Sequence, residues 1–313
     1  MINIQGPGSL KKISGKSCNY IGRIPDILFA RKHLTSPKEE KNIQKTKNLF
    51  AFVSSPKIYK DKRILSKVCG WCHSFRDPDI FLPKSIPKIL LPESDFIDPM
   101  FVACNKKENT VYDFFYFTIN SQDGIRHKGL DIFCKCLDIL CCKHKLRGVV
   151  IVYFPNVAKI KKFRITNNEQ NNVIHRNSKY LTFLWGKLSN EKMSELCSRC
   201  KFGFFPNRID NSPRIIAESL VRDIPVMIFD QIHGGWHYVS ENSGCIFNIE
   251  NLNEKIEYIL NNKFYPREWY LNNFGFEKSS RKLANFVQSL VKLDNVYSHM
   301  YFNNFEKYLR KIK

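Results

Sequence analysis

The alternation of apolar and polar positions is clearest from Val111 onward. Short, nearly continuous apolar runs predict strands at 111–118, 148–154, 180–185, 202–205, 225–229 and 245–248. Segments of helical periodicity lie between or after them, at 129–144, 190–200, 213–222, 251–261, 266–273, 277–292 and 297–311. Because strands that are covered on both faces read as continuous apolar runs, this order predicts an α/β domain with a doubly wound parallel sheet.

The N-terminal part of the chain carries weaker signals. Strands are predicted at 2–5, 49–53, 68–71 and 86–91, with a glycine turn at residues 6–8. Residues 9–47, rich in Lys, Ser and Asn, are expected to be loop-rich or partly mobile. We therefore expect an abbreviated N-terminal α/β domain at 1–105, a second α/β domain at 106–293, and a basic helical tail at 294–313.

Composition excludes a disordered protein, because 43% of the 313 residues are hydrophobic. The net charge of +21, from 50 Lys and Arg against 29 Asp and Glu, favours an anionic partner: a nucleotide diphosphate, an anionic lipid surface or a nucleic acid. The basic residues are scattered and match no nucleic-acid recognition motif, so nucleic acid is the least favoured of the three. The N-terminus has no signal-peptide pattern, and no run of about 18 apolar residues could cross a bilayer. We expect a cytoplasmic protein that is either soluble or held to a membrane only at its surface.

The 11 cysteines include two CxxC pairs, Cys69 with Cys72 and Cys197 with Cys200. Such pairs form a zinc site when they lie close together, but here 124 residues separate them. The second pair also falls on the apolar face of a predicted helix. We therefore interpret these cysteines as core residues in a reducing compartment, and we expect no metal site.

The first candidate site residues follow the strand predicted at 111–118. In an open parallel sheet, ligands bind beyond the carboxyl ends of the strands. Arg126 and Lys128 lie there, just before a helix predicted to begin at Gly129. Two cations beside helix amides suit a diphosphate. The simpler alternative is that Lys128 is a solvated cation at a helix start.

Two carboxylates, Asp210 and Glu218, lie eight positions apart after the strand predicted at 202–205. Between them, Pro213 predicts the first position of a helix, so amides at Asn211 and Ser212 face the loop. Amides at a helix start bind anionic oxygens, a carboxylate beside them can hold sugar hydroxyls, and a second carboxylate two turns later can reach a ribose. This pattern indicates a sugar-nucleotide site. The alternative is an ordinary strand–helix–strand unit with surface acids.

A third loop, after the strand predicted at 225–229, holds the Gly234-Gly235 pair, which permits close backbone approach or forms a flexible turn.

Four segments of the chain, taken in order, resemble the C-terminal domain of GT-B glycosyltransferases of the family 4 type. They are RHKG, LWGKLSNEKMSELCSRCKFGFFPN, DNSPRIIAESLVRDIPVMI and HGGWHYVSENSGCIFN. The resemblance covers about residues 111–293. It implies two Rossmann-like domains with parallel sheets facing a cleft, the N-terminal one abbreviated here.

The resemblance also implies an activity: the retaining transfer of a sugar from a nucleotide-diphosphate sugar to an acceptor hydroxyl of a glycan or lipid-linked glycan. By this resemblance Lys128, with Arg126 as its partner, contacts the donor diphosphate. Asp210, where the family usually has Glu, contacts the transferred sugar, and Glu218 contacts the ribose. The amides of Asn211 and Ser212 complete the donor site. The family often has an acid at the position of Tyr238.

In the first domain, His73 is the best match to a family histidine near the reacting sugar, although a lone histidine is more often structural. The departing diphosphate would be stabilised by Lys128, Arg126 and helix amides without a metal ion or cofactor. The sequence Asp77-Pro78-Asp79 has the letters of a metal motif, but we interpret it as a proline turn.

Two alternatives stay open from the sequence. The short N-terminal half is also compatible with a degenerate GT-B protein that binds a nucleotide sugar without turnover. A basic nucleic-acid-binding protein is the other alternative. The basic tail, residues 307–313, is a candidate contact for anionic lipid head groups.

Overall fold

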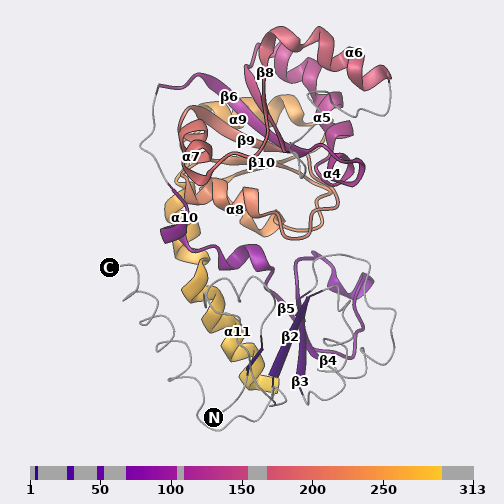
Figure 1. Cartoon of the computed structure of the whole chain (residues 1–313), viewed down its shortest axis with the longest axis vertical. Coiled ribbons are helices and arrows are strands. Elements are labelled where there is room, and N and C mark those ends of the chain that lie inside the picture. Colours follow the sequence, from indigo (N-terminus) through magenta and orange to yellow (C-terminus); the bar gives the residue numbers. More distant parts are fainter. Residues whose placement is uncertain are drawn as a thin grey trace. The chain divides into compact units, whose positions relative to one another are not determined.

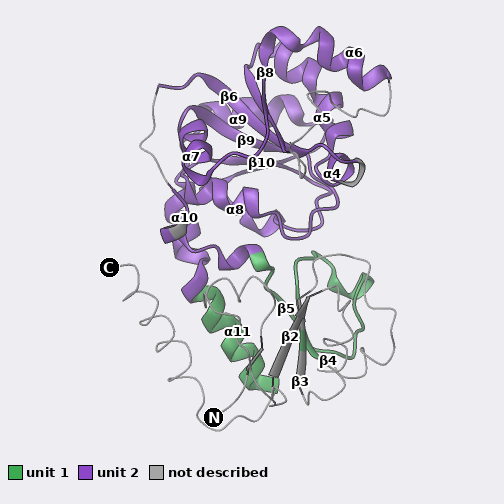
Figure 2. Ribbon diagram, in the orientation of Figure 1, with its two compact units in different colours: residues 1–93, 278–313 green, residues 94–277 purple. Residues whose placement is uncertain are grey.

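The structure is a computed structural model that describes residues 4–5, 27–31, 48–52, 68–103, 109–153 and 168–290. The chain forms two compact units (Figures 1 and 2). Unit 1 comprises residues 1–93 and 278–313, and unit 2 comprises residues 94–277. The glycine turn at residues 6–8, the helix expected at 297–311 and the basic tail lie outside the described residues.

Unit 2 is built on a six-stranded sheet in which every neighbouring pair is parallel. Its strands are β6 (Tyr112–Ile119), β7 (Gly148–Tyr153), β8 (Leu181–Trp185), β9 (Cys200–Phe205), β10 (Val226–Phe229) and β11 (Gly244–Phe247). They lie in the order β11-β10-β9-β6-β7-β8. From β6 the chain adds β7 and β8 on one side of the sheet and then β9, β10 and β11 on the other side. This is the doubly wound arrangement that the sequence predicts.

Helices cover both faces of this sheet (Figure 1). They are α4 (Gln122–His127), α5 (Leu130–Leu137), α6 (Asn168–Arg176), α7 (Asn190–Ser198), α8 (Arg214–Val221), α9 (Leu252–Asn261) and α10 (Pro266–Asn273). Neighbouring residues of β9 show the two apolar layers: Phe204 packs in a cluster with side chains of α5 and α9, and Phe205 packs in a cluster with side chains of α7, α8 and α10. Both residues are fully buried, which explains why the strands read as continuous apolar runs.

One helical prediction for unit 2 needs correction, and one helix of the unit lies where none was predicted. The helix expected to begin at Gly129 is preceded by a separate helix, α4, because the Ser121 hydroxyl accepts a hydrogen bond from the Gly124 amide (3.0 Å) and caps a helix that begins one residue after it. The rest of the expected helix is α5 followed by a π-helix, η4 (Asp138–Lys143). Helix α6 lies in a stretch for which the polar sequence gave no prediction.

Unit 1 contains a second parallel sheet, whose strands lie in the order β1-β2-β3-β4-β5. The strands are β1 (Ile4–Gln5), β2 (Ile27–Arg31), β3 (Asn48–Phe52), β4 (Val68–His73) and β5 (Lys88–Leu90). The expectation that residues 9–47 are loop-rich is wrong at 27–31. The segment ILFAR is short and apolar, and it pairs with strands on both sides, which a local reading of a Lys-rich stretch does not anticipate.

Helix α11 (Phe276–Leu290) belongs to unit 1 from Lys278 onward. Phe286 explains this: its ring lies 6.1 Å from that of Phe50 in β3, and it lies so close to Gly70 in β4 that a Cβ there would come within 2.8 Å of it. At the other junction Ile97 and Val102 join the apolar cluster of unit 2. The chain is therefore divided between the units at Glu93/Ser94 and at Glu277/Lys278, whereas we expected boundaries near 105 and 293.

The cysteines of the described residues are free thiols. Cys197 and Cys200 are fully buried in the apolar cluster of α7 and α8, which confirms their interpretation as core residues. Burial raises the pKa of the Cys134 thiol to about 12, so this thiol stays protonated and unreactive at neutral pH.

Candidate functional site

The topology of unit 2 places a site between β6 and β9. These strands are neighbours, and the chain leaves them in opposite directions, so the loops that follow them diverge at their carboxyl ends. Open α/β sheets bind ligands at this switch point. Lys128 lies in the turn between α4 and α5 that follows β6, and Asp210 lies in the loop that follows β9. We call residues 206–213 the donor loop, after the role that the resemblance implies for them.

Lys128 and Asp210 form an ion pair at this point, between the Lys128 Nζ and the Asp210 Oδ2. The side chains are only 12% and 15% exposed, so water screens their charges less than those of a surface pair. Asn207 Nδ2 donates a second hydrogen bond to the same oxygen (3.0 Å). The Lys128 ammonium also lies 5.9 Å from the centre of the Phe117 ring. The two charged groups therefore contact Asn207 and the Phe117 ring as well as each other.

Backbone geometry fixes Lys128 in front of the donor loop. Gly129 has a φ of 67°, and a Cβ on it would lie 1.8 Å from the Pro206 carbonyl oxygen. Only glycine allows this turn and this close approach. The Tyr116 hydroxyl donates to the Lys128 carbonyl oxygen (3.1 Å). Burial raises the pKa of Tyr116 far above its usual value, so the hydroxyl remains a donor.

The loop after β10 braces the other side of the donor loop. The Gly234 amide donates to the Asp210 carbonyl oxygen (3.0 Å). A Cβ on Gly234 would lie 2.0 Å from the Asn211 carbonyl oxygen, and Gly235, with a φ of 85°, lies against Pro213. The close-approach interpretation of the Gly234-Gly235 pair is therefore confirmed, and the three loops predicted to carry the site lie together.

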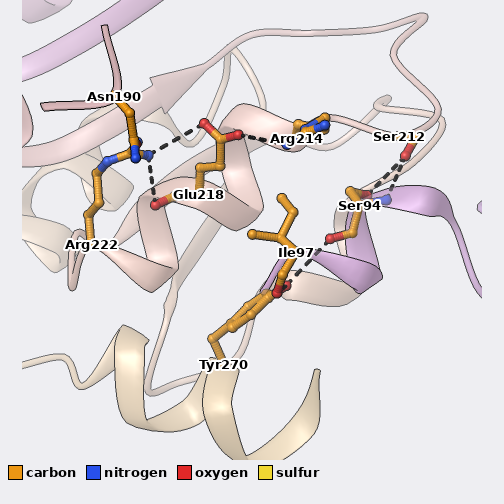
Figure 3. Close-up of polar contacts among 8 residues, drawn as sticks. All are labelled: Ser94, Ile97, Asn190, Ser212, Arg214, Glu218, Arg222 and Tyr270. Carbon is orange, nitrogen blue, oxygen red and sulfur yellow. Dashed lines mark hydrogen bonds and ion pairs between the residues drawn. The ribbon is translucent and has the colours of Figure 1, made fainter. Parts of the chain in front are cut away.

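Glu218 has partners of its own. Its carboxylate forms ion pairs with Arg214, the first residue of α8, and with Arg222, the residue that follows α8, each at 3.4 Å. Arg222 is almost completely buried and also donates to the Asn190 side chain (2.7 Å) and the Glu218 carbonyl oxygen (3.1 Å), as Figure 3 shows. The two carboxylates that the sequence assigned to one site thus have different partners: Asp210 pairs with Lys128, and Glu218 is held between two arginines.

Ser212 and Asn211 lie in the donor loop, immediately before α8. The Ser212 hydroxyl oxygen accepts a hydrogen bond from the Ser94 amide (2.9 Å) and lies 3.1 Å from the Ser94 hydroxyl. Asn211 is 3% exposed. Pro213 is the N-cap of α8 and makes no side-chain capping bond, so the expectation that Pro213 is the first helical residue is off by one position.

The two remaining predicted site residues, Arg126 and His73, lie near the ends of α4 and β4. Arg126 is exposed in the last turn of α4. His73 is the last residue of β4, as expected, and is buried against Phe75 with the two rings stacked. The Asp77-Pro78-Asp79 segment is a turn, as interpreted: Asp77 caps a 3-10 helix, η1 (Pro78–Ile80), and Asp79 forms an ion pair with Lys88 (2.8 Å).

Arg208 is a site residue that the sequence did not reveal. It lies in the donor loop, and its guanidinium forms an ion pair with Asp131 in the first turn of α5 (2.5 Å). Its carbonyl oxygen accepts from the His233 amide (3.0 Å). Arg208 therefore connects the loops after β9 and β10 to the first turn of α5. Its place beside Asp210 was the only signal in the sequence.

Within the described residues, no three His, Cys, Asp or Glu side chains cluster so that they could hold a metal ion. No helix in the described part of the chain is long and apolar enough to cross a membrane.

Comparisons with known proteins agree on the fold. No protein-family model and no curated protein sequence matches this chain. Solved structures do: the lipopolysaccharide outer core galactosyltransferase WaaB in its apo form has a TM-score of 0.63 and 9% identity, over 91% of this chain and 79% of that one. Sucrose-phosphate synthase from Thermosynechococcus elongatus has a TM-score of 0.61 and 12% identity, over 85% of this chain and 74% of that one.

The pneumococcal O-GlcNAc transferase GtfA, solved in complex with UDP and GlcNAc, has a TM-score of 0.60 and 10% identity over 84% of this chain. The alignment spans 56% of the length of GtfA. These structures are GT-B glycosyltransferases, so the GT-B fold expected from the sequence is confirmed. At these identities they establish the fold alone.

Proposed function

We propose that this chain is a retaining glycosyltransferase of the family 4 type, which moves a sugar from a nucleotide-diphosphate sugar to an acceptor hydroxyl of a glycan or lipid-linked glycan. The observation that carries the proposal is the ion pair of Lys128 and Asp210 at the switch point of a parallel sheet in a GT-B fold. A diphosphate requires a cation, and sugar hydroxyls require an acceptor. The pair supplies one of each at the place where such folds bind ligands.

Lys128 is the group that we assign to the leaving diphosphate. An ammonium has three N–H donors, and one of them is used by Asp210. The others can be donated to phosphate oxygens, whose negative charge grows as the sugar departs. Pro213 makes no side-chain capping bond at the start of α8, and we also assign the backbone amides there to the diphosphate. We assign Arg126 as a further cation. The leaving group is then stabilised by the chain itself, without a metal ion or cofactor.

The two acids take separate roles in this proposal. Asp210 Oδ2 accepts from Lys128 and Asn207, so we assign Oδ1 to a hydroxyl of the transferred sugar. Glu218 is assigned to the ribose. A carboxylate offers about four lone-pair sites, so Glu218 can accept from a ribose hydroxyl while it is paired with its arginines. His73, at the end of β4, is assigned to the reacting sugar.

A degenerate GT-B protein that binds a nucleotide sugar without turnover is the second candidate. It is motivated by the abbreviated first domain that the sequence of residues 1–105 predicts. The two candidates share the donor site and differ only in catalysis. The net charge of +21 is compatible with contact to anionic membranes in either case.

The proposal is tested by thermal unfolding of the protein with UDP-, GDP- and ADP-sugars. A ligand that binds only the folded state stabilises it by about 2.7 kcal/mol at 100 times its Kd. One nucleotide class should raise the Tm of the wild-type protein, and the increase should be lost in Lys128→Ala. A flat response to all three classes would refute the donor site, and a response without sugar transfer would favour the degenerate protein.

A further inference from the structure

The Ser212 hydroxyl in the donor loop is held by a residue 118 positions earlier in the chain. Ser94 lies in the 3-10 helix η2 (Glu93–Phe96) and is fully buried. Its amide donates to Ser212 Oγ (2.9 Å), and the two hydroxyl oxygens lie 3.1 Å apart (Figure 3). Ser94 therefore fixes both the position and the orientation of the Ser212 side chain.

Tyr238 in turn holds Ser94. The Tyr238 hydroxyl oxygen lies 2.7 Å from Ser94 Oγ and 2.6 Å from the Asp95 carboxylate. His237 Nε2 lies 2.9 Å from the same carboxylate oxygen. Tyr238 is fully buried and Asp95 is 2% exposed. The residues Asp95, Tyr238, Ser94 and Ser212 thus form a continuous hydrogen-bonded chain, which we call the anchor chain.

The number of hydroxyl protons fixes the direction of the hydrogen bonds in the anchor chain. A phenol has a single proton, so only one of the two contacts of Tyr238 can use it. Burial, and then the nearby charge of Asp95, raise the pKa of Tyr238 well above its usual range, so the hydroxyl stays protonated. With Asp95 as a carboxylate, which only accepts, Tyr238 donates to Asp95. Ser94 then donates to Tyr238, and Ser212 donates to Ser94.

The anchor chain connects the donor loop to both ends of unit 2. Ser94 and Asp95 are its first residues, and the Asp95 carbonyl oxygen accepts from the Gly275 amide (3.0 Å), two residues before its last one. Burying polar groups costs free energy unless each of them is hydrogen-bonded. Apolar side chains could hold η2 in place without this cost. What the hydrogen bonds add is one defined geometry for Ser212.

We propose that Ser94 and Tyr238 are positioning residues of the donor site: through the Ser212 hydroxyl they hold the turn that carries Asp210 and the amides before α8. The proposal rests on the proposed function for its effect on the donor. Neither residue needs to touch the substrate. Their anchoring of the donor loop can be measured without any donor.

The direct test is hydrogen exchange of the donor loop in the free protein. Tyr238→Phe removes only the hydroxyl and keeps the ring, and Ser94→Ala removes the hydroxyl from the middle of the anchor chain. Both should speed exchange of the amides of residues 207–212 by about tenfold, the loss expected for one hydrogen bond. The matched control is Tyr270→Phe, whose buried hydroxyl reaches the same segment through the carbonyl oxygens of Ser94 (3.4 Å) and Ile97 (3.3 Å) but lies outside the anchor chain.

Unchanged exchange in both anchor-chain variants, or the same increase in the Tyr270→Phe control, would overturn the anchoring. If Tyr238→Phe does not fold, Ser94→Ala gives the answer, with Ser94→Thr expected to restore slow exchange. In transfer assays with a nucleotide sugar, the KM for that substrate should rise about tenfold in Tyr238→Phe. The kcat of this variant should stay close to the wild-type value. A fall in kcat at constant KM would contradict the positioning role. If the wild-type protein binds no nucleotide sugar, the proposed function fails, and the exchange measurement still decides the anchoring.

Discussion

Asp210 accepts a hydrogen bond from the Lys128 ammonium across 82 positions of the chain. The two residues follow β6 and β9, the strands on either side of the switch point in the sheet of unit 2. The pair therefore depends on the complete fold of the unit. A cation and a carboxylate are thus held together at the place where open α/β sheets bind ligands.

Replacing Lys128 with Ala should lower kcat/KM for transfer by about 100-fold to 1,000-fold, the effect of removing one preorganised group that stabilises developing negative charge. The overall fold should remain, because the side chain lies at a turn and Gly129 keeps its backbone geometry. Initial rates with a nucleotide sugar, together with far-UV circular dichroism, measure the two parts of this prediction.

Lys201→Ala is the matched control. Lys201 forms an ion pair with Asp113 (2.8 Å) in the same unit, but at the start of β9 and β6 rather than at their carboxyl ends. Its activity should stay within about twofold of wild type, because the Lys201 side chain is 48% exposed and a pair with a solvated partner contributes about 1 kcal/mol or less. Equal losses in the two variants would mean that charge in general, and not this site, supports activity.

Glu218 has a structural role besides the one we assign to it, because it partners the buried guanidinium of Arg222. Glu218→Ala should therefore destabilise the fold by about 1–3 kcal/mol, the cost of leaving a buried group short of a partner. Glu218→Gln keeps an acceptor oxygen for Arg222, so its loss of stability should be smaller while its affinity for the donor still falls. Urea unfolding and donor titration separate the effects. Wild-type donor affinity in Glu218→Gln would rule out the ribose contact.

Gly129→Ala should destabilise unit 2 more than Gly186→Ala does. Both glycines have positive φ values, 67° and 115°, so each alanine bears a backbone strain of about 1–3 kcal/mol. A Cβ at Gly129 also meets the Pro206 carbonyl oxygen at 1.8 Å, whereas nothing lies within 4 Å of a Cβ at Gly186. The difference in unfolding free energy between the variants measures the contact with the donor loop. Equal destabilisation would argue against that contact.

The stability of the protein should fall in mild acid, partly because of His233. Burial lowers the pKa of His233 in the folded state, so the unfolded chain binds a proton more readily. Its contribution is complete above the ordinary histidine pKa, about 6.5, and is lost as the pH falls through that value toward the lower folded pKa. His233→Asn should flatten the pH dependence of the urea midpoint between about pH 5 and pH 7.5. His175→Asn, at an exposed position of α6, should leave it unchanged. An identical slope in His233→Asn would contradict this assignment.

The sheet of unit 2 was predictable because its strands are buried on both faces and read as apolar runs bounded by turn residues. The loops that carry Lys128, Asp210 and Gly234 could be chosen in advance because residues that follow parallel strands meet at one edge of the sheet. The predicted sequence positions therefore came together once the strand order was known.

Contacts between distant segments were not predictable in the same way. Ser94 and Tyr238 are 144 positions apart, and nothing in either local sequence indicates that they pair. The arginine partners of Glu218 were missed for a related reason. The spacing of Asp210 and Glu218 suggested a shared site and gave no indication that Arg214 and Arg222, at i−4 and i+4, pair with Glu218. Strand β2 was missed because its pairing partners, and not its own composition, stabilise it.

The most direct test of the proposed function is the release of nucleotide from UDP-, GDP- and ADP-sugars, with and without candidate acceptors, by the wild-type protein and by Lys128→Ala. The wild-type protein should turn over one nucleotide class, with the anomeric configuration of the sugar retained in the product by NMR, and Lys128→Ala should show about 1% of that rate or less. Equal turnover by the two proteins, or no turnover of any donor by the wild-type protein, would contradict a glycosyltransferase built on the pair of Lys128 and Asp210.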